Sequence, residues 1–102
     1  MKEFPKVVAL GANLESLHVL RSFKKMNIQI CELFTLETKD EKRGSDYINF
    51  HKYKDELNLD IFEIQSINSS KALNRLNYLK PDYIFILGWS EIISAAVLDT
   101  VN

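Results

Sequence analysis

Apolar residues in this 102-residue chain gather into four short runs, separated by stretches with helical spacing. The runs are rich in Val, Ile, Leu, Phe and Tyr, residue types that favour strands. They cover residues 6–10, 28–35, 60–64 and 83–87. The last run is apolar at every position, which is typical of a parallel strand covered on both faces.

The stretch after the first run predicts a helix that ends at about Met26. Asn13 can cap its N-terminus, Glu15 suits the first turn of the helix dipole, and Asn27 is a stop signal. The expected apolar stripe consists of Val19, Leu20, Phe23 and Met26, with Ser16 and Leu17 at its start.

A polar segment follows the second run. Residues 37–46 include Gly44 and predict a loop. Asp46 can cap a short helix over residues 47–57, although its aromatic rings blur the helical period.

The clearest helical spacing lies between the third and fourth runs. Asn68 or Ser69 can cap this helix, and Pro81 ends it. Its apolar positions are Ala72, Leu73, Leu76 and Leu79. A last helix is expected over residues 94–101, where small and aliphatic residues cluster.

Strands and helices therefore alternate along the chain. This order predicts an α/β fold with one open parallel sheet, helices on both faces and right-handed crossovers. Residues 1–102 show no repeat and no linker, so a single domain is expected.

The charge balance adds little to this picture. The formal net charge is −1, and basic residues are mixed with acids, as over residues 39–43, so no electrostatic field points to nucleic acid. The N-terminus has no signal-peptide pattern and no apolar run is long enough to span a membrane, which predicts a cytoplasmic protein.

The cysteine and the histidines predict no metal site. Cys31 lies inside the second apolar run and is expected to be a small buried hydrophobe. His18 falls on the polar face of its helix, and His51 has no recognisable partner. Their spacing with Cys31 matches no metal-ligand pattern.

One candidate site is the turn after the first run, at Gly11, Ala12 and Asn13. A glycine before a helix N-terminus is where phosphates bind in such folds, because free N–H groups and the helix dipole favour an anion. The three-glycine dinucleotide fingerprint and the phosphate-loop motif are both absent. A tight turn with an Asn cap and an anion site both remain open.

The second candidate follows the fourth run. In open parallel sheets, ligands gather beyond the carboxyl ends of the strands. Here Gly88 allows a sharp turn, Trp89 is suited to wall a pocket for a flat ring, and backbone groups of residues 91–93 are suited to bond its edge. The alternative is a turn whose Trp packs against the last helix.

Residues 81–93, Pro-Asp-Tyr-Ile-Phe-Ile-Leu-Gly-Trp-Ser-Glu-Ile-Ile, followed by Val97 and Leu98, resemble the folate-dependent formyltransferase family. The wording is similar to the methionyl-tRNA and nucleotide-sugar branches. The start of the chain, residues 7–17, is similar to the first strand and loop of the glycinamide ribonucleotide branch.

The resemblance implies a Rossmann-like sheet with strand order 3-2-1-4 and a pocket for the formyl donor, 10-formyltetrahydrofolate. The pocket would be lined by Gly88, Trp89, Ser90, Glu91, Ile92 and Ile93. Residues 11–13 would face the amine acceptor, a sugar amine or methionyl-tRNA, and only the latter would make nucleic acid a partner.

The family's catalytic Asn, His and Asp follow a fifth strand, and no residue of this chain matches them. The resemblance therefore implies the N-terminal part of a formyltransferase, inactive alone and without catalytic residues of its own. Strand four would be an edge, so self-association through it, or marginal stability, is expected. The alternative is a non-catalytic α/β domain that binds a ligand or a protein.

Overall fold

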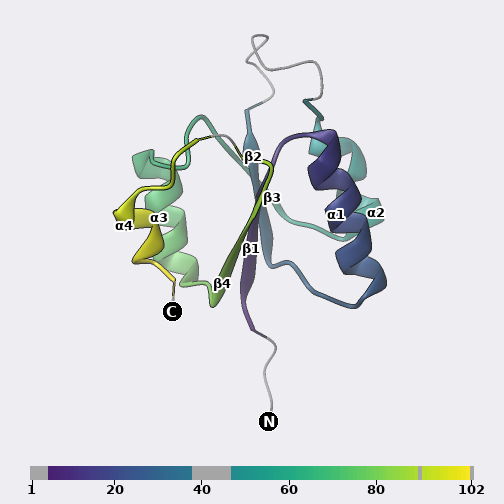
Figure 1. The fold of residues 1–102 in the computed structure, drawn as a ribbon, viewed down its shortest axis with the longest axis horizontal. Coiled ribbons are helices and arrows are strands. Elements are labelled where there is room, and N and C mark those ends of the chain that lie inside the picture. The colour runs from purple at the N-terminus through teal and green to yellow at the C-terminus, as the bar shows by residue number, and fades with distance from the viewer. Residues whose placement is uncertain (1–4, 38–46, 90, 102) are drawn as a thin grey trace.

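Four parallel strands form one sheet between two layers of helices in the computed structural model, which describes residues 5–37, 47–89 and 91–101 (Figure 1). The strands are β1 (Val7–Gly11), β2 (Glu32–Leu36), β3 (Ile61–Ile64) and β4 (Tyr83–Leu87). Their order across the sheet is β3-β2-β1-β4. The predicted Rossmann-like α/β architecture and strand order are thus confirmed.

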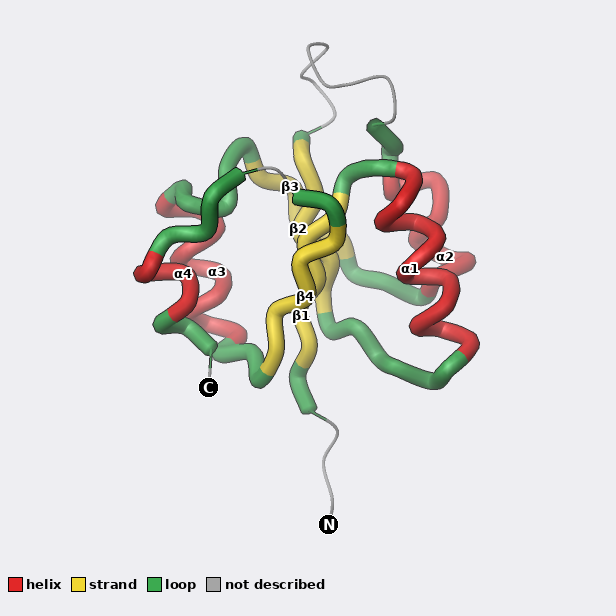
Figure 2. The backbone as a smooth tube through the Cα atoms, viewed as in Figure 1, coloured by secondary structure: helices red, strands yellow, loops and turns green. Residues whose placement is uncertain are grey.

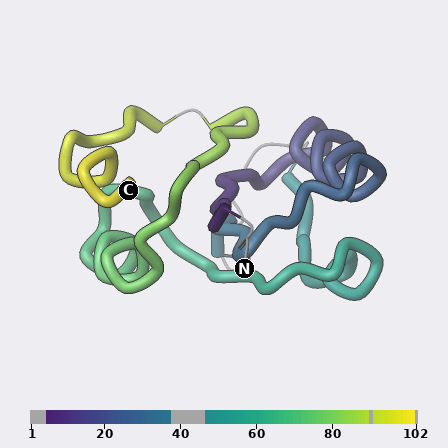
Figure 3. The backbone as a smooth tube through the Cα atoms, turned by 90° about the horizontal axis from the view of Figure 1, so that it is seen from below, coloured from purple at the N-terminus to yellow at the C-terminus, as the bar shows by residue number. Residues whose placement is uncertain are grey.

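The helices cover both faces of the sheet (Figure 2). Helix α1 (Leu14–Lys25), the 3-10 helix η1 (Phe50–Tyr53) and α2 (Lys54–Leu57) lie on one face. Helices α3 (Ser70–Leu79) and α4 (Ala95–Leu98) lie on the other. The view along the strands separates the two layers, with the sheet between them (Figure 3).

The central strand β1 is buried along its whole length and belongs to two cores. Val8 and Leu10 pack with the α3 and α4 face, where Phe34 is also fully buried. Ala9 packs on the opposite face with Leu17 and other side chains of α1, η1 and α2. The alternation of side chains along a strand divides β1 between the layers.

The sequence misplaced the start of β2 and the environment of Cys31. Asn27 has a positive φ of 60°, which ends α1 and turns the chain. The following residues cross to the sheet as a connection, so the strand begins at Glu32 rather than Ile28. Cys31 lies in this connection and is exposed, which corrects the expected buried position.

The expected stripe on α1 is only partly in the core. Ser16, Leu17 and Leu20 are buried, whereas the side chain of Met26 is 60% exposed. Phe23 points toward β4, where its ring centroid lies 5.2 Å from that of Phe85. The predicted stripe therefore spans both the buried side of α1 and the side that borders β4.

The other predicted helices shift at their ends. The helix expected over residues 47–57 is divided into η1 and α2, because Asn49 caps a 3-10 turn that buries Phe50. Ser69, rather than Asn68, caps α3, and the last helix is shorter than predicted. The predicted loop lies mostly outside the described residues, as does Asp46. No helix among those described is long and apolar enough to cross a membrane.

A buried ion pair joins α3 to β2. The carboxylate of Glu32, 5% exposed, accepts two hydrogen bonds from Arg75, at 2.8 Å from Nε and 2.6 Å from Nη2. These bonds raise the pKa of Arg75. Its guanidinium also lies over the rings of Phe62 and Tyr78, 5.5 and 5.3 Å from their centroids.

Arg75→Ala is expected to lower the free energy of unfolding by about 2–3 kcal/mol, because it leaves a buried carboxylate without its charged partner. The partial exposure of the arginine keeps the loss below that of a fully buried pair. Arg21→Ala is the matched control, since its pair with Glu56 is exposed at both ends and is expected to change stability little. Urea unfolding measures both, and equal losses would contradict the assignment.

Strand β4 is the edge of the described sheet and is not covered on both faces as expected. It pairs with β1 over all of Tyr83–Leu87, but Tyr83 is 54% and Ile86 47% exposed. Tyr83 N donates to Lys6 O at 3.3 Å, so its peptide groups face β1. Those of Ile84 and Ile86 then point away from the sheet, because neighbouring peptide groups of a strand alternate.

We expect the 102-residue chain to self-associate through this edge, and Ile86→Lys to weaken the association because a charged side chain opposes strand pairing. Light scattering over a concentration series measures the change. Tyr78→Lys is the control, because Tyr78 is a more exposed apolar residue and lies on α3. A monodisperse wild-type monomer with a sharp melt at high concentration would refute the prediction.

Candidate functional site

The two segments singled out in the sequence meet at the carboxyl edge of the sheet. Gly11 and Leu87 are register partners at the ends of β1 and β4, so the turns that follow them leave the sheet side by side. The Asn13 amide Nδ2 donates to Gly88 O at 3.4 Å. Residues 11–13 and 88–93 thus form one contiguous region, at the upper end of the sheet in Figure 1.

The first turn is filled by the chain's own side chains. Asn13 caps α1 as predicted, with its Oδ1 accepting from Ser16 N at 2.9 Å. The Ser16 hydroxyl lies 2.8 Å from Asn13 Oδ1 and 2.6 Å from Leu87 O, and its one proton serves these two acceptors. An anion at this helix would have to compete with the cap for the Ser16 N–H.

Glycine is required on both sides of this contact. A Cβ on Gly11 would lie 2.7 Å from Ser16 Cβ, so only glycine lets α1 approach the end of β1 this closely. Gly88 has a φ of +68°, and a Cβ there would lie 2.9 Å from Asn13 Nδ2. The two glycines let the β1–α1 turn and the end of β4 touch.

The second segment presents one exposed and two partly buried apolar side chains. Trp89 and Ile93 pack against the core on the α3 and α4 face, which agrees with the packing interpretation of Trp89, and each keeps an accessible part. Ile92 is 87% exposed, more than any other large apolar residue described. Gly88 is exposed, and Ser90 lies outside the described residues.

Glu91 turns inward and fixes the segment. Its Oε1 accepts from Trp89 Nε1 at 3.2 Å and from Ile67 N at 2.8 Å, and its Oε2 accepts from the hydroxyl of Ser66. The sequence assigned Glu91 to the pocket lining but gave no sign of these contacts. Ile67 is fully buried, so the carboxylate satisfies an amide that water does not reach.

The loop between β3 and α3 was missed by the sequence as part of this region. Asn68 Nδ2 donates to Ile92 O at 2.8 Å, and its Oδ1 accepts from Ser94 N at 2.9 Å. Asn68 was singled out only as a possible cap of α3. The signal that could have found it is the polar run at residues 66–70, where an Asn exceeds what capping requires.

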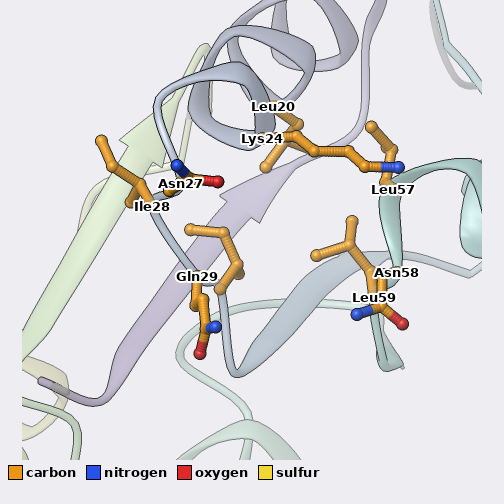
Figure 4. A pocket seen from close by; sticks show the side chains of 9 residues that line it. Leu20, Lys24, Asn27, Ile28, Gln29, Leu57, Asn58 and Leu59 are labelled. Atoms are coloured by element: carbon orange, nitrogen blue, oxygen red, sulfur yellow. The ribbon is translucent and has the colours of Figure 1, made fainter.

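A separate hollow of about 320 Å³ lies at the opposite, amino edge of the sheet, between the C-terminal ends of α1 and α2 (Figure 4). Leu20, Leu57 and Leu59 form its apolar wall, and Asn27 and Asn58 stand at its rim. Lys24 donates from Nζ to Glu56 O beside it. None of its lining residues belongs to either predicted segment.

The histidines do not join the carboxyl-edge region. His18 is exposed on α1, as expected. His51 does have a partner, because its Nε2 lies 3.2 Å from Glu63 Oε2. Within the described part of the chain, no group of three or more His, Cys, Asp or Glu is placed to hold a metal ion.

Comparison with protein-family models and with curated proteins gave no match to this chain. The resemblance to formyltransferases therefore rests on the wording of residues 81–93 and 7–17.

Gly11→Ala is expected to lower the free energy of unfolding by about 1–3 kcal/mol, because the new methyl group overlaps the side chain of Ser16. The double variant Gly11→Ala with Ser16→Gly removes the opposing Cβ and is expected to recover part of the loss. Thermal and urea unfolding of the three proteins measure this. A stable single variant, or a double variant worse than the sum of its parts, would contradict the close approach.

Proposed function

We propose that residues 88–93 bind the formyl donor 10-formyltetrahydrofolate, and that the chain is the N-terminal part of a formyltransferase acting on an amine acceptor held near residues 11–13. The observation that carries the proposal is the hydrogen bond from Asn13 Nδ2 to Gly88 O, which joins the two segments. A donor bound on one segment would lie beside an acceptor bound on the other, as group transfer requires.

The chemistry of the segment suits a flat, partly polar ring. The Trp89 indole offers a face for stacking, and Ile92 offers an exposed apolar contact beside it. Backbone N–H and C=O groups can bond the edge of a pterin. Because Ile92 O already accepts from Asn68, the proposal places these bonds mainly on other backbone groups of the segment.

In the proposed reaction the acceptor amine attacks the formyl carbon and forms a tetrahedral intermediate. The bond from that carbon to N10 of the folate then breaks, and the proton lost by the amine balances the one gained by N10. Such a transfer needs a general base and stabilisation of the oxyanion. The proposal gives the residues of this chain the binding of donor and acceptor, and none of the proton transfers.

A non-catalytic binding domain is the second candidate. The exposed edge of β4 favours it, because Tyr83 and Ile86 leave apolar surface beside unpaired peptide groups of the described sheet. An edge of this kind accepts an extended segment of a partner by strand addition. This function would require no folate.

The test is a titration of the chain with 5-formyltetrahydrofolate, a stable relative of the donor. Saturable quenching of Trp89, the only tryptophan in the sequence, with a Kd below about 1 mM is expected. Free N-acetyltryptophanamide corrects for absorption of light by the folate. Calorimetry on Trp89→Ala, for which we expect weaker binding, and on the surface control Tyr78→Ala tests the location.

Absence of both heat and quenching up to millimolar folate would refute donor binding and favour the second candidate. Equal binding by Trp89→Ala and the wild type would move the folate away from residues 88–93.

A further inference from the structure

The loops that follow β3 and β4 are held together although these two strands lie at opposite edges of the described sheet. Both loops lead into helices on the same face, α3 and α4. The contact is made by polar side chains rather than by strand pairing. Glu91 reaches from the β4–α4 loop to the β3–α3 loop, and Asn68 reaches back.

The Glu91 carboxylate connects three groups that are distant in the sequence or on a side chain of their own. Ile67 N, at 2.8 Å, and Trp89 Nε1, at 3.2 Å, share Oε1, and the Ser66 hydroxyl donates to Oε2. Hydrogen bonds to a charged acceptor are stronger than those between neutral groups. The indole is therefore held by a group that is itself anchored to a buried amide.

Asn68 fixes the other half of the same loop. Its amide donates to Ile92 O and accepts from Ser94 N, which caps the approach to α4. The backbone of Ile92 is thus tied down while its side chain is 87% exposed. An exposed apolar side chain on an anchored backbone loses little conformational entropy when a ligand covers it.

We infer that Glu91 and Asn68 are positioning residues of the ligand site, and that the β3–α3 loop at residues 66–68 is part of its framework. Glu91 sets the orientation of the Trp89 ring, and Asn68 sets the place of Ile92. Naming the ligand as a folate rests on the proposed function. The positioning itself does not, because it depends only on the contacts between the two loops.

The experiment compares Glu91→Ala, Glu91→Gln and Asn68→Ala with the control Glu63→Ala, which removes a partly exposed carboxylate paired with His51. Emission wavelength and acrylamide quenching of Trp89 are measured without ligand, and calorimetry with 5-formyltetrahydrofolate follows. In Glu91→Ala we expect a red shift, greater quenching and a Kd raised about 10-fold. Glu91→Gln keeps an acceptor oxygen, so its Kd is expected to rise less than about 3-fold.

Asn68→Ala is expected to weaken folate binding with little change in Trp89 emission, because it acts on Ile92. The control is expected to match the wild type in all readings. If Glu91→Ala proves unfolded, Ser66→Ala, which removes one bond to the carboxylate, takes its place. A role limited to stability would lower the melting temperature and leave emission and Kd unchanged, and that result would overturn the inference.

The two proposals fail in different ways. A wild type that binds no folate refutes the proposed function, while the ligand-free fluorescence series still decides whether Glu91 orients Trp89. Unchanged emission and quenching in Glu91→Ala refute the positioning role, whatever the folate titration shows.

Discussion

The complete burial of β1 is the constraint on which the rest of the structure depends. Each residue of Val7–Gly11 is buried, and the side chains alternate between two apolar cores. A strand buried on both faces needs neighbours on both sides to satisfy its peptide groups, and β2 and β4 supply them. The parallel direction of these neighbours then requires crossover helices, which form the two outer layers.

The same arrangement creates the candidate site. In a parallel sheet all carboxyl ends lie at one edge, so the turns after β1, β3 and β4 leave in the same direction. Two different devices then join them. Glycine at positions 11 and 88 allows direct contact between the β1 and β4 turns, and the side chains of Glu91 and Asn68 bridge the longer gap to the β3 loop.

The edge of β4 and the site share a strand but place opposite demands on it. The β1 side of β4 is satisfied over five register pairs, and its end is held by Ser16 and Asn13. Its other side leaves the peptide groups of Ile84 and Ile86 directed outward. Helix α1 extends the apolar character of this side, because its Phe23 reaches toward β4 rather than into the main core. The edge is thus an apolar surface in line with the candidate site.

Most of the fold was predictable because its signals are local. Apolar runs located the strands, and Asn13 and Ser69 marked helix starts by residue type. Errors arose where the outcome depends on distant contacts. Cys31 has the composition of a strand residue but lies in a connection, and β4 has the composition of a covered strand but lies at an edge.

By itself, the sequence determined the α/β class, the order of elements and the two glycine turns, since these follow from side-chain periodicity and backbone freedom. Strand order came from the resemblance, and the structure agrees with it. Only the tertiary structure decided which polar groups near the site are engaged. Glu91 meets Ile67 N and Asn68 meets Ile92 O because the α3 and α4 layer brings two loops together, and no local pattern encodes a contact across that distance.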